Sequence, residues 1–268
     1  MDLRLKGKSA LITGGSSGIG KGIATVLAGE GVNLAIASRN PDPEAIEELR
    51  SHGTRVEPIR ADVSEEEQAV GMVEQAVALF GHLDLYVNNA AWTWHQPVTK
   101  IDSQSWFKTI NTNLSAAMWA CRGASRHMIG RGKGSIVVVS STAQFMVGYG
   151  ETSYRVSKFG LTALVQDMAV ELAPFGIRVN MVTPGHFVTR MTGWDRLNKE
   201  KTEEFRDRYI PMRRFGDPPE VGNAVAFMLS DKVSNYVTGG NIVVDGGLHL
   251  YPVSVLSDDE IRTLNAEE

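Results

Sequence analysis

The sequence predicts an α/β fold in which a parallel sheet carries helices on both faces, and three observations lead to this prediction. Short apolar runs of strand length alternate with helical stretches along the chain. A glycine-rich turn joins the first run to the first helix. Polar residues directly follow several of the runs. Right-handed crossovers bring the carboxyl ends of parallel strands to one edge of the sheet, where ligands bind.

Seven strands are expected, because each apolar run is short and is bounded by polar or turn-forming residues. A sheet that is covered on both faces favours such nearly continuous apolar strands over strictly alternating ones. The predicted strands cover residues 9–13, 32–37, 55–59, 83–87, 135–139, 177–182 and 241–244.

Helices are expected between these strands. The first begins at the glycine-rich turn and continues through residue 30. Ser64 and Glu67 have the spacing of a capping box, which predicts a helix from there to residue 80. The other predicted helices cover residues 103–129, with an interruption at 111–113, residues 152–173 and residues 218–230.

Residues 189–214 carry many acidic and basic side chains and are expected to form a small helical lid over the cleft. A polar surface helix without a lid function would have the same composition. The sequence contains no internal repeat and no linker, so residues 1–252 are expected to form one domain. Residues 253–268 are expected to form a polar, acidic tail.

Composition excludes several classes of protein. The 268 residues are 43% hydrophobic and 22% charged, with a formal net charge of −4, which gives no electrostatic footprint for nucleic acid. The chain shows no secretory signal and no apolar run long enough for a membrane span. Cys121 is the only cysteine and is expected in a helix core, and the six histidines lack metal-ligand spacing. We therefore expect a cytoplasmic protein without a metal site.

Tyr154 and Lys158 are four residues apart on a predicted helix and therefore lie on one face of it. A nearby ammonium favours the phenolate form of a tyrosine and lowers its pKa, which makes such a pair a plausible acid/base unit. A surface helix that carries both residues by accident is the alternative. Of the six tyrosines only Tyr154 has this partner.

The glycine-rich turn at residues 14–20 stands between a strand and a helix, where glycines and a helix N-terminus can hold a pyrophosphate. A plain tight turn is the alternative. Dinucleotide sites for NAD carry an acidic residue about 20 positions past the glycines. Ser38 and Arg39 stand there instead, and a guanidinium suits the 2′-phosphate of NADP. A solvated loop arginine would also fit this position.

Several short motifs occur together in one order over nearly the whole chain, and in this the chain resembles the short-chain dehydrogenase/reductase family. The resemblance implies a single-domain Rossmann fold, a doubly wound sheet of seven parallel strands. The matching elements are Thr13-Gly-Gly-Ser-Ser-Gly-Ile-Gly20, Asn88-Asn-Ala-Ala91, Asn113, Ser141, Tyr154-x-x-x-Lys158 and Pro184-Gly185. Ser141 is preferred to Ser140 because the family places its serine 13 positions before the tyrosine.

The resemblance also implies roles for the catalytic residues. Tyr154 would donate a proton in reduction and accept one in oxidation, and Lys158 would lower its pKa and hold the nicotinamide ribose. Ser141 would hydrogen-bond the substrate oxygen. Asn113 would distort its helix and hold a water that relays protons to Lys158.

Cofactor residues carry over in the same way, with NADP(H) preferred and NAD(H) possible. The family has glycine where this chain has Ala91, a departure that adds one methyl group to the pocket wall. The implied cofactor-binding residues are Thr13, Gly14, Ser17, Gly18, Ile19, Gly20, Ser38, Arg39, Asp62, Val63, Asn89, Ala90, Tyr154, Lys158, Pro184, Gly185, Val188 and Thr189.

Three segments are expected to wall the substrate pocket, and their aromatic faces and polar tips suit a small polyhydroxylated alcohol or ketone. The end of the chain from Asp245 to Pro252 resembles glucose 1-dehydrogenases of the family. The expected substrate-binding residues are Trp92, Trp94, His95, Gln144, Tyr149, His186 and Trp194.

Two alternatives to a sugar or polyol enzyme stay open. One is a 3-oxoacyl-(acyl-carrier-protein) reductase, although Phe175 stands where those enzymes tend to have a docking arginine, and Arg131 and Lys133 could replace it. The other is a catalytically silent NADP(H)-binding sensor. The resemblance further implies a homotetramer in which helices 103–129 and 152–173 pair with their copies. Strand 241–244 with Leu248, Leu250 and Tyr251 would form a second contact.

Overall fold

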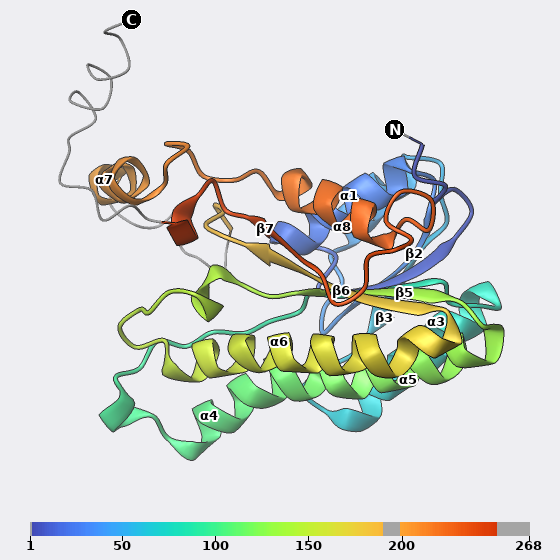
Figure 1. Ribbon diagram of the computed structural model, residues 1–268, viewed down its shortest axis with the longest axis horizontal. Helices are drawn as coiled ribbons and strands as arrows, with labels where there is room; N and C mark the ends of the chain where they lie inside the picture. The colour runs from blue at the N-terminus through green and yellow to red at the C-terminus, as the bar shows by residue number, and fades with distance from the viewer. Residues whose placement is uncertain (1, 190–198, 251–268) are drawn as a thin grey trace, which may run out of the picture.

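The computed structural model describes residues 2–189 and 199–250 and has an α/β, Rossmann-like fold (Figure 1). Its sheet contains seven strands in the order β3-β2-β1-β4-β5-β6-β7. Every neighbouring pair in this sheet is parallel. The predicted fold class is therefore confirmed.

The strands agree with the predicted runs to within two residues at each end. The first and the last strand coincide with their predictions, and β6 continues two residues further, into the Pro184 of the Pro-Gly motif. The strands are β1 (Ser9–Thr13), β2 (Asn33–Ser38), β3 (Val56–Arg60), β4 (Leu85–Asn88), β5 (Gly134–Val139), β6 (Ile177–Pro184) and β7 (Asn241–Val244).

Helices cover both faces of the sheet, as Figure 1 shows. Successive strand residues point to opposite faces, so Leu11 lies in the core beneath α3, α5 and α6, and Ile12 lies in the core beneath α1, α2 and α8. Cys121 is fully buried in α5, as expected. The helices are α1 (Gly18–Gly29), α2 (Pro43–Arg50), α3 (Glu66–Phe80), α4 (Ser103–Ile110), α5 (Ala116–Arg131), α6 (Thr152–Leu172), α7 (Lys199–Tyr209) and α8 (Pro218–Leu229).

Helices α1 and α8 pack together through two glycines, although they come from opposite parts of the chain. A Cβ at Gly22 would collide with the backbone of Pro218, and one at Gly222 would meet the carbonyl of Gly22. This close approach requires residues without side chains. It holds the helix that follows the glycine-rich turn against the last helix before β7.

The carboxyl end of α8 is held by the buried side chain of Arg178, from β6. Its guanidinium donates hydrogen bonds to the carbonyls of Met228 at 2.7 Å, Leu229 at 3.1 Å and Ser230 at 3.1 Å. These are the carbonyl groups that a helix end leaves without intrahelical partners.

Two expectations about helix ends differ from the structure. The capping box predicted at Ser64 is wrong, because the Ser64 amide and hydroxyl both donate to the Asp62 carboxylate, at 3.0 and 2.7 Å, and α3 begins at Glu66. A capping box occurs instead at α8, where the Glu220 side chain accepts from the Asp217 amide at 2.8 Å. Local Asx-type bonding has outcompeted the box at Ser64.

The expected interruption near Asn113 is a π-helical turn, η2 (Asn111–Ser115), which separates α4 from α5. A single π-turn within a helix often marks a functional site.

Leu248 is buried within the chain itself rather than exposed for a partner, while Leu250 is 69% exposed and Tyr251 lies outside the described residues. None of the helices in the described ranges has the length and apolar character to cross a membrane.

Candidate active site

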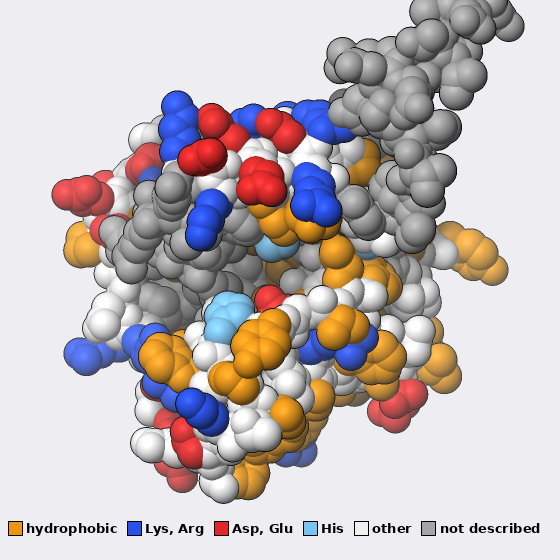
Figure 2. All heavy atoms as spheres, turned by 90° about the vertical axis from the view of Figure 1, so that its left-hand side faces the viewer, with side chains coloured by type: hydrophobic (Ala, Val, Ile, Leu, Met, Phe, Trp, Pro, Cys, Tyr) orange, Lys and Arg blue, Asp and Glu red, His pale blue; other side chains and the backbone are white. Residues whose placement is uncertain are grey.

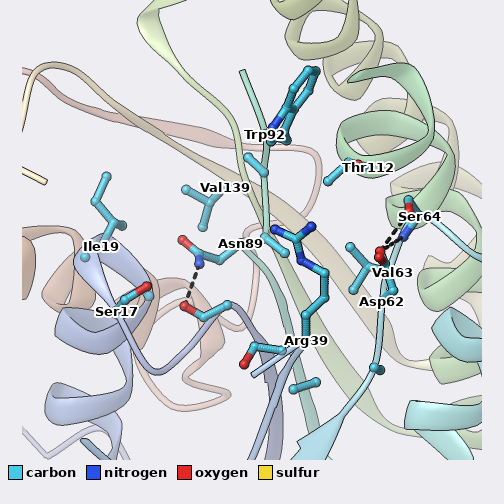
Figure 3. Close-up of a pocket in the computed structure, with 18 of the residues that line it drawn as sticks. Ser17, Ile19, Arg39, Asp62, Val63, Ser64, Asn89, Trp92, Thr112 and Val139 are labelled. Carbon is cyan, nitrogen blue, oxygen red and sulfur yellow. Dashed lines mark hydrogen bonds between the residues drawn. The ribbon is translucent and has the colours of Figure 1, made fainter. Parts of the chain in front are cut away.

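A cavity of about 310 Å³ opens at the carboxyl edge of the sheet, where the strand ends gather as predicted. Figure 2 looks onto this edge and shows charged side chains of both signs gathered over α7. Figure 3 shows the cavity with side chains from several strand ends converging on it. The residues that line it are Gly14, Ser17, Gly18, Ile19, Gly20, Ala37, Ser38, Arg39, Ala61, Asp62, Val63, Ser64, Asn89, Ala90, Ala91, Trp92, Lys108, Thr112, Val139, Ser140, Tyr154, Lys158 and Thr189.

The glycine-rich turn is fixed to the end of β4 by hydrogen bonds. The Thr13 hydroxyl accepts from the amides of Asn89 at 2.9 Å and Ala90 at 3.0 Å, and the Asn89 side chain donates to the Thr13 carbonyl at 2.9 Å. Gly14 and Gly18 have positive φ angles of 68° and 51°, which favour glycine. A Cβ at Gly20 would collide with the Gly14 carbonyl.

The first turn of α1 contains no acidic side chain, and its N-cap Ser17 makes no capping hydrogen bond with its side chain. Its backbone N–H groups thus keep their capacity to bind an anion at the positive end of the helix dipole. This arrangement fits a pyrophosphate group.

The end of β2 fits the adenosine side of an NAD(P) cofactor. The Ser38 hydroxyl oxygen is buried and has no hydrogen-bond partner within the described part of the chain, an unusual state that a ligand hydroxyl or phosphate would relieve. Arg39 points into the cavity, facing Asp62 and Val63 across it (Figure 3). Burial opposes ionisation of Asp62, but hydrogen bonds from Ser64 and the charges of Arg39 and Lys108 hold its pKa below the usual value.

Lys158 and Tyr154 both line the cavity from α6. The Lys158 side chain is only 2% exposed, and its Nζ donates to the Val139 carbonyl at 3.1 Å. This Nζ lies 5.6 Å from the centre of the Tyr154 ring. Burial lowers the pKa of Lys158 to about 8, because an ammonium is poorly solvated there.

The expectation that Lys158 lowers the pKa of Tyr154 differs from the structure. Burial raises the pKa of Tyr154 to about 12, a hydrogen bond with Ser141 works in the opposite direction, and the negative charge of Glu151 raises it further. The physical reason is that the same burial that disfavours the phenolate also weakens the ammonium form of Lys158.

Ser141 and Asn113 lie near this pair but do not line the cavity. Ser141 is the serine that hydrogen-bonds Tyr154, whereas the neighbouring Ser140 donates to the Lys158 carbonyl at 3.3 Å. Asn113 is fully buried in η2, where its oxygen accepts from the Trp92 amide at 2.8 Å and its nitrogen donates to the Trp92 carbonyl at 2.9 Å. The Asn113 side chain thus anchors the loop after β4.

Some expected cofactor residues lie outside the cavity. Thr13 is buried and acts through the hydrogen bonds described above. Pro184 ends β6, and Gly185 follows it next to Asp245, whose atoms a Cβ at Gly185 would strike. Val188 is 49% exposed. The remaining expected cofactor residues all line the cavity.

The expected substrate residues are less well gathered. Trp92 lines the cavity and stacks with Trp94 at 6.3 Å between ring centres. Trp94 and His95 are more than half exposed, and Tyr149 is 86% exposed. Trp194 lies outside the described residues.

Gln144 and His186 are placed away from the cavity that contains Tyr154. Gln144 is buried, and its amide nitrogen donates to the Thr183 hydroxyl at 2.7 Å, so it has no face toward a substrate. His186 lines a second cavity, and its ring packs edge-on against Phe205 of α7 at 4.9 Å. Burial lowers the pKa of His186 to about 4 and keeps the ring neutral.

A family model described as "Enoyl-(Acyl carrier protein) reductase" matches residues 14–249. A 3-oxoacyl-[acyl-carrier-protein] reductase FabG of Staphylococcus aureus is 37% identical over 246 residues, which cover 91% of this chain and 98% of that protein. An L-rhamnose-1-dehydrogenase of Scheffersomyces stipitis is 35% identical and is aligned over 91% of this chain and 96% of its own length.

Solved structures agree with these relatives. A short-chain type dehydrogenase/reductase from Mycobacterium marinum superimposes with a TM-score of 0.85 at 32% identity, over 92% of this chain and 97% of that one. The chain belongs to the short-chain dehydrogenase/reductase family. A candidate NAD(P)-dependent gluconate 5-dehydrogenase of that fold from Beutenbergia cavernae holds NADP at low occupancy. It has a TM-score of 0.86 and 32% identity, over 92% and 99% of the two chains.

As a member of the short-chain dehydrogenase/reductase family, the protein is an NAD(P)-dependent oxidoreductase. This favours an enzyme over a silent sensor. Two residues near the reaction centre of this dehydrogenase/reductase were not expected from the sequence. Lys108 places its Nζ 4.6 Å above the Trp92 ring, and Glu151 stands three residues before Tyr154.

Sequence signals for both residues exist but are weak. Lys108 stands four residues before Thr112 in a predicted helix, a spacing that places both side chains on one helix face. Assigning Thr112 to the cavity would therefore have suggested Lys108 as a neighbour there. Glu151 is an acidic residue close to an acid/base candidate, a combination that shifts pKa values.

Proposed function

We propose that the protein interconverts a secondary alcohol and a ketone by NADP(H)-dependent hydride transfer, with Tyr154 as the acid/base group. The observation that carries the proposal is the presence of Tyr154, Lys158 and the Ser38-Arg39 pair in the lining of one cavity. A redox cofactor and a proton-transfer group can therefore meet at one substrate carbon.

The chemistry divides between cofactor and chain. When bound, the nicotinamide supplies or accepts the hydride, and its oxidised form adds a positive charge near the phenol. Tyr154 then gives a proton to the substrate oxygen in reduction and takes it back in oxidation. Ser141, which hydrogen-bonds the Tyr154 hydroxyl, orients the same oxygen.

Lys158 is proposed to hold the nicotinamide ribose and to return a proton to Tyr154. A pKa of about 8 allows its amine to change protonation near neutral pH, which a proton-relay group requires. Asn113 is proposed to position the loop after β4 through its two bonds to Trp92. The water relay implied by the family resemblance belongs to the same proposal.

Preference for NADP(H) is proposed from the end of β2. The unpartnered Ser38 hydroxyl and the Arg39 guanidinium offer donors to a 2′-phosphate, and no acidic residue stands beside them in the sequence. The NADP held by the Beutenbergia structure supports this preference.

For the substrate we propose a sugar, polyol or similar small alcohol or ketone. The aromatic faces of Trp92 and Trp94 and the polar tips of the surrounding loops support it, as does the likeness to an L-rhamnose-1-dehydrogenase. The likeness of the chain's end to glucose 1-dehydrogenases belongs to the same proposal.

A 3-oxoacyl-(acyl-carrier-protein) reductase is the second candidate, favoured by the 37% identity to FabG. Docking of an acidic carrier would require free positive charge near residue 175. Phe175 is uncharged, and Arg131 is already bound to the Asp84 carboxylate at 2.8 Å. Lys133 is exposed and is left as the single docking cation of this group.

The deciding experiment is a panel of NADP⁺ reduction and NADPH oxidation with aldoses, polyols, cyclic ketones and acetoacetyl thioesters. We expect the highest kcat/KM with a polyhydroxylated substrate. A clear preference for acetoacetyl thioesters would replace the sugar proposal by the reductase one. Absence of turnover throughout the panel with either cofactor would contradict the proposed reaction.

We also propose a homotetramer built from one domain per chain. Phe107 of α4, Met118 of α5 and Phe159 of α6 are apolar residues that are 60%, 38% and 60% exposed, as expected of faces that pair with their copies. Light scattering at micromolar concentration tests this, and a monomer would contradict it.

A further inference from the structure

An acidic side chain and a histidine meet beside the reacting phenol and have no role in the proposed chemistry. Glu151 precedes α6 and stands three residues before Tyr154. Its carboxylate oxygen Oε1 lies 3.5 Å from Nε2 of His95, which comes from the loop after β4. Two segments that are far apart in the sequence are thus joined, one leading away from the cavity-lining Trp92 and the other leading into the cavity-lining Tyr154.

The backbone brings these two loops together. The Gln96 amide donates to the Gly150 carbonyl at 3.0 Å, directly beside the His95–Glu151 contact. Gly150 has a φ of +76°, and a Cβ there would press against the Gln96 backbone at 3.3 Å. Gly148 leaves room for the Glu151 carboxylate, because a Cβ at that position would occupy the carboxylate's place. The pair is therefore built into the loop geometry rather than arising from two free side chains.

Glu151 stands three residues before Tyr154, at the N-terminal end of the same helix. Its negative charge raises the pKa of Tyr154, so the carboxylate lies within electrostatic reach of the phenol. Both members of the pair are accessible to a ligand, since the Glu151 side chain is 30% exposed and that of His95 is 58% exposed. Within residues 2–189 and 199–250, the second carboxylate oxygen of Glu151 has no hydrogen-bond partner.

A partly exposed carboxylate with a free oxygen can accept hydrogen bonds from hydroxyl groups of a ligand. The adjacent imidazole can donate or accept a second bond to a neighbouring hydroxyl. A ligand carboxylate in this position would face a like charge at short range, which is unfavourable. The nearby Arg155 directs its Nε–H elsewhere, to the Met146 carbonyl at 2.9 Å.

We propose that Glu151 and His95 form a specificity-determining pair that binds a hydroxyl group of a neutral polyhydroxylated substrate and disfavours substrates with a carboxylate at that position. This inference rests on the proposed function and narrows its substrate class. It separates neutral sugars and polyols from sugar acids such as gluconate, the substrate named for the Beutenbergia structure.

The test compares kcat/KM for neutral and anionic substrates in the intact protein with NADP⁺. L-rhamnose and D-glucose are the neutral probes, and D-gluconate and D-glucuronate are the anionic ones. In the wild type we expect the neutral probes to be favoured. In Glu151→Gln, which keeps the size but removes the charge, we expect the ratio of neutral to anionic kcat/KM to fall about ten-fold. Glu151→Asp keeps the charge and should retain discrimination against the anions, but its shorter side chain should raise the KM for the neutral probes.

The matched control is Glu171→Gln, which makes the same charge change at the exposed far end of α6 and should leave the ratio unchanged. The NADPH dissociation constant should stay within about two-fold in all variants, since the pair lies at the substrate end. An unchanged ratio in Glu151→Gln overturns the inference, as does a wild type that prefers the anionic probes. Turnover of thioesters alone would also overturn it while leaving the proposed hydride chemistry intact, whereas failure of every substrate would contradict that chemistry itself.

Discussion

The two sides of the cleft are built in different ways. The cofactor side consists of strand ends and backbone, with the glycine-rich turn bonded to β4 through Thr13 and Asn89. The substrate side consists of side chains on two long loops, where Trp94, His95 and Tyr149 are exposed and few hydrogen bonds cross from one loop to the other. A rigid backbone thus fixes what all members of such a fold bind, and adaptable side chains fix what each member acts on.

Tyr154→Phe removes the proton-transfer group that stands between the cofactor side and the substrate side of the cleft. Of the substitutions considered, it is expected to have the largest effect on kcat/KM. It removes one hydroxyl group and little volume, so proton transfer is lost while the cofactor side stays intact. We expect kcat/KM to fall by roughly 10³-fold, with NADPH affinity within about three-fold of the wild type. Steady-state kinetics and NADPH titration measure both quantities.

Tyr236→Phe serves as the control for this change, because Tyr236 also loses a hydroxyl group but is fully exposed, lies between α8 and β7 and does not line the cavity. It should retain nearly full activity. Substantial turnover by the Tyr154 variant, or a matching loss in the Tyr236 variant, would refute the assignment.

Gly20→Ala tests whether the cofactor side depends on backbone shape. The added Cβ would collide with the Gly14 carbonyl and the Asn89 side chain, so the turn has to move. We expect a loss of about 2–4 kcal/mol in stability and a clear weakening of NADPH binding, measured by thermal unfolding and titration.

The control is Gly71→Ala in α3, where no atom lies within 4 Å of the added Cβ. There the substitution should stabilise the helix by about 0.5–1 kcal/mol. Normal NADPH affinity in Gly20→Ala would show that the turn tolerates a side chain.

The buried Lys158 makes the folding stability of the protein depend on pH. Its pKa is about 8 in the fold and near 10.5 in the unfolded chain, so between these values the unfolded state binds the additional proton. Stability therefore rises as pH increases from about 8 to 10, because the cost of burying the ammonium disappears.

The expected gain from Lys158 is about 2–3 kcal/mol and should be missing from Lys158→Met. Tyr154 changes the folding stability in the opposite direction, because its pKa is raised in the folded protein and stability therefore falls above about pH 10. Denaturant unfolding at pH 7.5 and pH 9.5 measures the difference below that limit. Equal pH dependence in wild type and variant would contradict the burial of a titrating Lys158.

Arg39→Ala tests how much a single side chain contributes to binding on the cofactor side. Loss of one charge-assisted contact should cost about 1.5–3 kcal/mol in NADPH binding, roughly one to two decades in affinity, and leave NADH binding nearly unchanged. Arg60→Ala is the control, since Arg60 is an exposed arginine at the end of the neighbouring strand and does not line the cavity. Equal kcat/KM for both cofactors in the wild type would overturn the preference.

The same contrast explains what the sequence could predict. All seven strands follow from local patterns, because an apolar run followed by Gly14 or Ser38 already indicates a strand end on the ligand edge. The family resemblance, rather than a local pattern, supplied most of the expected cofactor residues that line the cavity. Gln144 was misjudged because its burial depends on Thr183, a residue of a different strand. No local pattern reports such a contact.

The electrostatics of Tyr154 were misjudged for a related reason. Helical spacing places Lys158 beside it, but the degree to which each is buried is decided by β5 and by the loops over the cleft. Glu151 and Lys108 were missed because their partners, His95 and Trp92, belong to another segment of the chain. Spacing thus predicts neighbours along one helix and is silent on neighbours across the fold.

The contact between Gly22 and Gly222 has a consequence for how the protein forms. The glycine-rich turn belongs to the first strand–helix unit, yet the helix that follows it rests on α8, which is synthesised near the end of the chain. Closing such a long loop makes this a slow, non-local step of folding. A nascent chain that ends before α8 should consequently fail to bind NADPH, however complete its first strands are. NADPH binding then becomes possible only after α8 has folded, so it indicates that nearly the whole chain is folded.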